Sequence, residues 1–158
     1  MHAEYFGEVI GRLPKILRRD VLTVWIHDGK YDFGGGNNNL LIYTQQATDL
    51  HIPRGNLDEA LIHEGSHTSL DSYLYGTDKW NQAVAADNIF VSDYARDNPQ
   101  REDVSETYLP WFATRYRKET FTPDELAQWE ADLGNRFKVF DEISAGSMEM
   151  NPYPDLTV

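Results

Sequence analysis

The sequence predicts an α+β fold in which a small mixed sheet packs against helices. Apolar residues recur at helical spacing near the N-terminus, short strand-like segments follow between residues 21 and 43, and several capped helical patterns occupy the remainder. Strands gathered in one part of a chain and helices in another are typical of the α+β class. At 158 residues, 41% of them hydrophobic, we expect a single domain spanning residues 1–158.

The N-terminal third supplies one helix and the sheet. Residues 3–18 are expected to form a helix that Pro14 kinks or ends, because proline lacks an amide hydrogen and clashes with the preceding turn. A strand is predicted at Val21–Ile26, followed by a turn. Residues 34–39, three glycines and three asparagines, are expected to be a loop that leads into a second strand at Leu40–Tyr43. The apolar face of the helix comprises Tyr5, Phe6, Val9, Ile10, Leu13, Ile16 and Leu17.

The helical half begins after Gly55. Asn56 is a good N-cap, and Glu59 completes a capping-box pattern for a helix that runs through Leu57, Leu61 and Leu70. A second helix is expected over residues 78–96, with core positions at Trp80, Val84, Ile89 and Phe90.

Two further helix starts are visible in the sequence. Asn98-Pro99 combines a cap with proline at the first helical position, and Thr122-Pro123 adds the capping-box acid Glu125. Pro110 is expected to kink the first of these helices, and residues 145–158 are expected to be an irregular tail. The apolar stripe of the last helix is expected to be core and consists of Leu126, Trp129, Leu133, Phe137 and Phe140.

Composition narrows the possible functions. The formal net charge of −12 repels nucleic-acid phosphates and anionic membranes, so neither is an expected partner, and it weakly favours basic peptides. No run of about 18 apolar residues exists, which argues against membrane insertion. Glu4 and Glu8 interrupt the stretch that a signal peptide would need. With no cysteine in the chain, a zinc ion could be held only by histidine and carboxylate side chains.

The segment His63-Glu64-Gly65-Ser66-His67 matches the H-E-x-x-H pattern of zinc metallopeptidases. Residues four apart lie on the same face of a helix, so both imidazoles can reach one zinc ion. Glu64 lies beside them, where its carboxylate can take a proton from an activated water. His27 and His51 are isolated in the sequence and are expected to be ordinary histidines.

A catalytic zinc needs a third protein ligand. The metzincin pattern does not apply, since Leu70 and Tyr73 occupy the places of its glycine and third histidine. Asp71 and Asp78 are possible ligands. Glu102 is the better candidate, because it lies four residues before Glu106 on an expected helix, so that one acid can bind the metal while the other orients a histidine.

The stretch Phe90–Asn98, with Tyr94 inside it, followed by Glu102 and Glu106, resembles the third-ligand segment of lethal-factor-like and Pro-Pro-endopeptidase-like zinc peptidases. The resemblance covers roughly residues 37–110. It implies a zincin-like fold of the gluzincin type and one zinc ion per chain. It also implies Glu102 as a ligand, Glu106 as a supporting acid and Tyr94 as the donor to the oxyanion.

In such peptidases an edge strand binds the substrate in extended form. The expected counterpart is the strand formed by Leu40, Leu41, Ile42 and Tyr43. The sequence therefore predicts an endopeptidase that acts on a peptide or protein, and similar peptidases are often secreted or periplasmic. Two alternatives stay open: a zincin-like module that binds peptides without cutting them, and a catalytic fragment of a larger secreted protein. The sequence indicates no oligomeric state.

Overall fold

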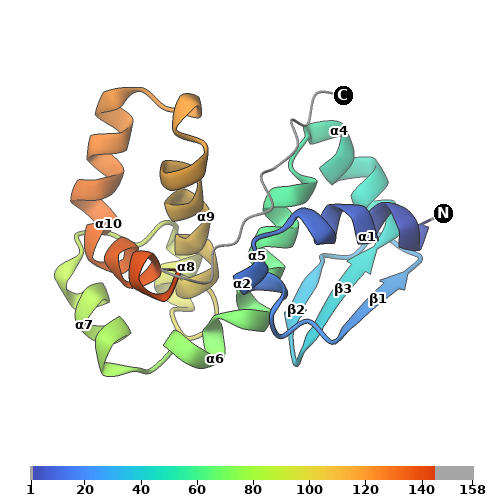
Figure 1. The fold of residues 1–158 in the computed structure, drawn as a ribbon, viewed down its shortest axis with the longest axis horizontal. Coiled ribbons are helices and arrows are strands. Elements are labelled where there is room, and N and C mark those ends of the chain that lie inside the picture. Colours follow the sequence, from blue (N-terminus) through green and yellow to red (C-terminus); the bar gives the residue numbers. More distant parts are fainter. Residues whose placement is uncertain (1, 145–158) are drawn as a thin grey trace. The chain divides into compact units, whose positions relative to one another are not determined.

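A computed structural model describes residues 2–144 of the chain. The structure is α+β, as predicted: helices predominate and one small mixed sheet is present among these residues. The chain divides into two compact units, one ending at Ser69 and the other beginning at Leu70 (Figure 1). The expectation of a single zincin-like domain stays a prediction, and the predicted irregular tail lies outside the described residues. None of the described helices is long and apolar enough to span a membrane.

The first unit opens with the predicted helix, which proline divides in two. Helix α1 spans His2–Arg12 and helix α2 spans Lys15–Arg18, with Pro14 as the residue that precedes α2. Most of the predicted apolar face is buried, so periodicity located these side chains correctly. The residues at most 5% exposed are Phe6, Val9, Leu13, Ile16 and Leu17.

The sheet has the order β1-β3-β2, with β1 at Thr23–His27, β2 at Gly34–Gly36 and β3 at Asn39–Tyr43. Strand β3 pairs in parallel with β1 and antiparallel with β2. Two expectations were therefore wrong. The three glycines form a strand rather than a loop, and Leu40–Tyr43 is the central strand rather than an edge strand.

Side chains alternate along β3, which places every second one in the core. Leu40 and Ile42 point into the core and are 0% exposed, whereas the intervening residues of β3 are half-buried. A strand with such an apolar face is stabilised most when hydrogen-bonded neighbours cover both of its edges. The glycine strand supplies one neighbour despite the low strand propensity of glycine.

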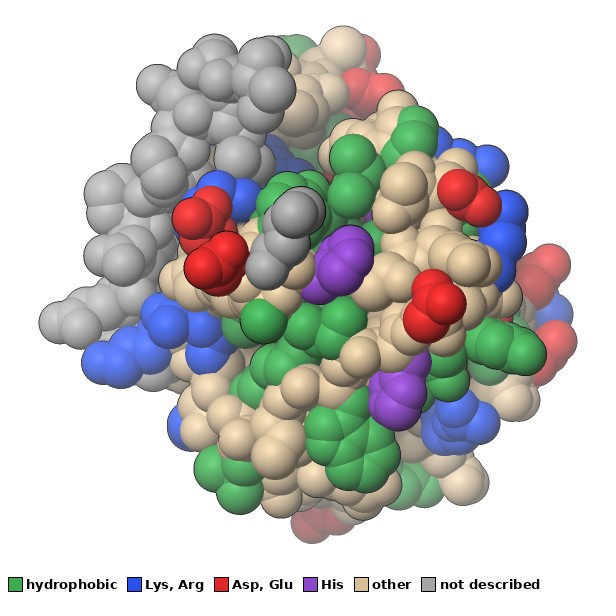
Figure 2. Space-filling view, turned by 90° about the vertical axis from the view of Figure 1, so that its right-hand side faces the viewer, with side chains coloured by type: hydrophobic (Ala, Val, Ile, Leu, Met, Phe, Trp, Pro, Cys, Tyr) green, Lys and Arg blue, Asp and Glu red, His purple; other side chains and the backbone are tan. Residues whose placement is uncertain are grey.

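Strand β1 forms the other edge of the sheet and is largely exposed. Trp25 is 56% exposed and Val24 is 37% exposed. Figure 2 faces the side on which β1 lies in Figure 1, and hydrophobic side chains lie there among histidine and charged side chains. The two edges of the sheet thus differ: β1 carries large side chains, and β2 carries none.

A helical connection links the sheet to the main helix of the first unit. It comprises α3 at Thr44–Gln46, a π-helical turn at Ala47–His51 and α4 at Ile52–Arg54. Gly55 ends it in the left-handed conformation, at a φ of 67°, which glycine adopts without strain. Helix α5 then spans Leu57–Ser69, close to the start that the sequence predicted.

The second unit is built from helices around an aromatic core. Trp80, Tyr108, Trp111, Phe137 and Phe140 are all at most 2% exposed. The ring of Phe140 contacts those of Trp80, Tyr108 and Trp111 at centroid distances of 5.2, 5.2 and 5.5 Å. The elements are α6 at Asp71–Leu74, α7 at Asp78–Ala86, α8 at Asp93–Asp97, α9 at Asp103–Tyr116, a 3₁₀ turn at Lys118–Thr120 and α10 at Pro123–Ser144.

Helix boundaries in this unit differ from the expectations in two places. Residues 78–96 do not form one helix: α7 ends before Asp87, whose carboxylate accepts hydrogen bonds from Asn135 and Arg136. Ile89, expected in the core, is 41% exposed in the segment that follows. Helix α9 begins at Asp103 rather than just after Asn98.

The remaining helix expectations fit the structure in part. Thr122 and Glu125 form the predicted capping box, in which each side chain accepts a hydrogen bond from the other residue's backbone amide. Helix α9 continues through Pro110, where a kink was expected. In the apolar stripe of α10, Leu133 is buried with Phe137 and Phe140, whereas Leu126 and Trp129 are half-buried.

Helices α9 and α10 are also joined by a polar contact that yields a pH prediction. Asp141 accepts two hydrogen bonds of 2.9 Å from Arg115 and one of 2.8 Å from Trp111. Partial burial acts to raise the pKa of Asp141, but these bonds and the charge of Arg115 outweigh it and hold the pKa below its usual 3.8. A carboxyl whose pKa is lowered on folding stabilises the protein above its unfolded pKa, and this contribution is lost as pH falls through the folded value.

We expect Asp141→Asn to lower the Tm at pH 7, because the amide cannot accept both charged hydrogen bonds. The difference from the wild type should narrow when the pH is lowered below about 3.8, the usual pKa of the aspartate. Thermal unfolding followed by circular dichroism over pH 2–7 measures it. Glu142→Gln is the control, since Glu142 is exposed and pairs only at the surface with Lys79. A difference between Asp141→Asn and wild type that is constant over this range would contradict the assignment.

Candidate metal centre

Helix α5 presents His63 and His67 on one face, one turn apart. Its opposite face is fixed by packing: Leu61 is fully buried, and a Cβ on Gly65 would lie 3.2 Å from the Cβ of Leu17 in α2. Small residues at Gly65 and Ser66 thus let α2 approach α5 closely. Packing against α2 thus fixes one face of α5. The half-buried face that carries His63 and His67 is available for metal binding.

The two imidazoles converge at their Nε2 atoms. These atoms are 3.1 Å apart, and the rings are perpendicular with their centroids 4.6 Å apart. Two nitrogens bound to one tetrahedral zinc at about 2.0–2.1 Å would be separated by about 3.3 Å. The pair is therefore spaced as zinc would require.

Protonation also favours a metal at this pair. Burial, followed by the proximity of His67, lowers the pKa of His63 from 6.5 to about 4. His63 is consequently neutral at pH 7. A metal need not displace a proton from this ring, because the lone pair of a neutral imidazole nitrogen is available for coordination.

The predicted third ligand, Glu102, occupies the N-cap position of α9 and is 4% exposed. Its carbonyl accepts the Glu106 amide hydrogen at 2.8 Å, so the two acids are one helical turn apart, as predicted. His63 and His67 of the first unit and Glu102 of the second form a group of residues that could hold a metal ion. Neither Asp71 nor Asp78, the alternatives from the sequence, belongs to this group.

Glu64, the predicted base, lies where β2 contacts α5. A Cβ added to Gly35 would be 2.0 Å from the Glu64 carbonyl oxygen, so the backbones of β2 and α5 touch at this point. The Thr68 hydroxyl reinforces the contact. It accepts the Gly36 amide hydrogen at 2.8 Å and contacts the carbonyl oxygens of Asn39 at 2.9 Å and Glu64 at 3.0 Å.

The two supporting residues lie in the second unit. Glu106 accepts a hydrogen bond from the hydroxyl of Ser92, which also caps α8 by accepting the Ala95 amide hydrogen at 2.9 Å. Tyr94 lies on α8 and is 54% exposed. The role of Glu106 in orienting a histidine and that of Tyr94 as an oxyanion donor stay predictions.

Several residues around the candidate centre escaped the sequence analysis. Ser92 carries a local signal, because serine before Asp93 is typical of a helix N-cap. The sequence around Gly35 predicts a loop rather than the observed strand, because a run of glycines indicates a loop. Thr68 carries no local signal: its hydroxyl acts through contacts with residues 29 and 32 positions away.

Comparisons with known proteins identify no relative. No protein-family model matches this chain, and neither does any curated protein or solved structure. The resemblance to zinc peptidases therefore stays a prediction based on the motif residues, and the case for function depends on the chemistry of the site.

The contact between β2 and α5 gives a sharp prediction from two neighbouring glycines. Gly35→Ala should lower the Tm by several degrees, because its methyl group would overlap the Glu64 carbonyl and push β2 away from the helix. Gly34→Ala is the matched control, since its Cβ meets Leu41 at an ordinary 3.5 Å. Thermal unfolding of both variants checks this. Equal changes in Tm would show that the close approach at Gly35 is unimportant.

Proposed function

We propose that this protein is a zinc-dependent endopeptidase, with His63, His67 and Glu102 as ligands and Glu64 as general base. The observation that carries the proposal is the pair of imidazoles on α5, whose Nε2 atoms lie 3.1 Å apart, with Glu102 as the predicted third ligand. The motif and its spacing predict the same three residues from the sequence. Agreement between a chemical pattern in the sequence and a spatial grouping supports a metal centre more than either does alone.

The donor set fits zinc. Two imidazoles and one carboxylate, with a fourth position for water or substrate, form a recognised ligand set of catalytic zinc sites. The chain has no cysteine, so the softer thiolate sites are excluded. The lowered pKa of His63 and the burial of Glu102 place a neutral nitrogen donor and an oxygen donor in surroundings that favour coordination over hydration.

When bound, zinc supplies Lewis acidity, which lowers the pKa of a coordinated water towards about 7 and polarises a peptide carbonyl. Glu64 directly follows the proposed ligand His63 and is half-buried; its carboxylate would take the proton of the attacking water and deliver it to the leaving amine. Tyr94 is proposed to donate a hydrogen bond to the developing oxyanion.

The substrate strand is reassigned from β3 to β2. Strand β2 lies at an edge of the sheet and contacts α5 beside Glu64, whereas β3 has a neighbour on each side. An extended peptide can pair with such an edge through main-chain hydrogen bonds. The glycines of β2 leave space for the side chains of the substrate, so the strand that was mistaken for a loop is the better candidate.

The metal assignment is tested by zinc content. We expect about one zinc per chain, by elemental mass spectrometry of protein purified without chelator. Glu102→Gln should lose most of it, because a neutral amide oxygen is a much weaker ligand than a carboxylate. Asp71→Asn is the control and should keep the metal, since Asp71 is an acid of the same unit outside the group. A zinc-free wild type that also takes up no zinc on titration would overturn the metal centre.

The catalytic assignment is tested separately. Glu64→Gln should retain zinc but cleave peptides at least about 10²-fold more slowly, as expected for the loss of a general base. Cleavage of a mixed peptide library, followed by mass spectrometry, measures this for wild type and variant. If the wild type binds zinc but cleaves nothing in the library, hydrolysis is the wrong assignment and a peptide-binding module takes its place.

A further inference from the structure

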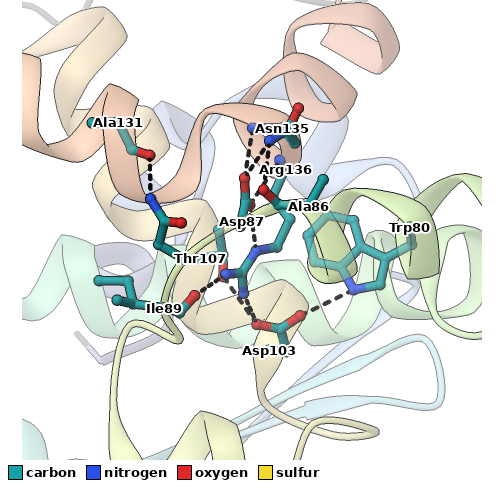
Figure 3. A network of polar contacts seen from close by, with 10 residues as sticks. Trp80, Ala86, Asp87, Ile89, Asp103, Thr107, Ala131, Asn135 and Arg136 are labelled. Carbon is teal, nitrogen blue, oxygen red and sulfur yellow. Dashed lines mark hydrogen bonds and ion pairs between the residues drawn. The ribbon is translucent and has the colours of Figure 1, made fainter.

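The second unit contains a buried ion network centred on Arg136 of α10 (Figure 3). The Arg136 side chain is 0% exposed, and its partners Asp87 and Asp103 are 0% and 1% exposed. Its Nε donates to Asp87 Oδ2 at 2.8 Å, Nη1 donates to Asp103 Oδ1 and Nη2 donates to the Ile89 carbonyl. Its guanidinium also lies 5.2 Å from the centre of the Phe90 ring. The donors of one side chain thus reach acceptors in three directions.

These partners belong to separate stretches of the chain. Asp87 ends α7, Ile89 lies in the segment between α7 and α8, and Asp103 is the first residue of α9. Asp103 is held further by Trp80 Nε1 at 3.1 Å and by the Thr107 hydroxyl at 3.3 Å. Arg136 therefore joins α10 to the end of α7, to the following segment and to the start of α9.

Stability alone is a weak explanation for such a network. Removing charges from water is costly, and replacing a buried ion group by uncharged residues is often neutral or stabilising. A buried network instead fixes one arrangement of its residues, because each acceptor must meet its hydrogen-bond donors in a single geometry.

The arrangement bears on both acids of the candidate centre. Glu102 immediately precedes Asp103, so fixing Asp103 fixes the backbone that carries the proposed ligand. The segment that Arg136 holds at Ile89 continues to Ser92, which donates a hydrogen bond to Glu106. Glu102 thus neighbours a residue that bonds to Arg136, and Glu106 bonds to a residue of the segment that Arg136 holds.

We propose that Arg136 is a positioning residue for the metal centre, which sets the place of Glu102 through Asp103 and that of Glu106 through the segment that carries Ser92. The inference rests on the proposed function, because it assumes that Glu102 binds the metal. In this role Arg136 contacts neither the metal nor the substrate. Loss of the Arg136 network is predicted to weaken metal affinity rather than to prevent folding.

The chain provides a matched control in Arg115. This arginine also joins α9 to α10: it donates two hydrogen bonds of 2.9 Å to Asp141 and one to Glu130. It lies in the last turn of α9, whereas Asp103 lies in the first. Losing Arg115 removes an interhelical ion network from the same unit without touching the residues around Glu102.

The test compares zinc affinity with thermal stability. The first variant is Arg136→Met combined with Asp87→Asn and Asp103→Asn, which removes the charges together and leaves amide oxygens to accept the neighbouring hydrogen bonds. We expect it to unfold cooperatively but to bind zinc about 10- to 100-fold more weakly, the usual cost of losing support around a ligand. Competition with a chromophoric chelator gives the Kd, and unfolding of zinc-free protein gives the Tm.

Two further variants separate positioning from stability. Arg115→Met should lower the Tm while the zinc Kd stays within about twofold of wild type. Arg136→Lys should bind zinc more tightly than the triple variant but less tightly than wild type, because one ammonium group cannot reproduce the directed donors of a guanidinium.

The inference is overturned if the folded triple variant binds zinc like wild type, or if Arg115→Met weakens zinc binding as much as the triple variant does. In either case wild type still binds zinc and the proposed function stands. If wild type itself binds no zinc, the proposed function and this inference fail together.

Discussion

The close contact between β2 and α5 is the constraint on which the first unit depends. A Cβ at Gly35 would lie only 2.0 Å from the Glu64 carbonyl oxygen, so the strand can approach the helix only because it lacks a side chain there. The Thr68 hydroxyl holds the same two elements together through Gly36 and Asn39. The sheet edge and the histidine-bearing helix are thereby fixed to each other, and any peptide paired with β2 would lie beside Glu64.

The second unit meets a related requirement by different means. An aromatic core around Phe140 stabilises the packing of its helices, but apolar contacts are not directional. Directional bonds act at the start of α9, where Arg136 and Trp80 both hold Asp103. The first unit thus positions its elements by close backbone contact, and the second positions the start of α9 by buried charged side chains.

The sequence was a good guide wherever the signal was local. The break at Pro14, the start of α5 after Gly55 and the capping box at Thr122 follow from single residues and their neighbours. It failed where partners distant in the chain decide the outcome. The glycine strand forms because β3 and α5 lie against it, and α7 ends at Asp87 because Asn135 and Arg136, 48 and 49 residues away, bond to that carboxylate. For the candidate centre, spacing selected His63, His67 and Glu102, but it carried no information about Ser92 or Arg136.

The burial of Glu102 bears on why a cation suits this place. A carboxylate only 4% exposed is costly to keep charged unless opposite charge lies close to it. Arg101 lies 3.8 Å from the Glu102 carboxylate, in an ion pair whose arginine side chain is 79% exposed. The neighbouring Asp103 adds a second buried acid, whose charge Arg136 offsets. A divalent ion at Glu102 would do for this carboxylate what Arg136 does for Asp103. Under the proposed function, the two adjacent buried acids at the start of α9 would thus have different cations beside them, Arg136 at Asp103 and a metal ion at Glu102.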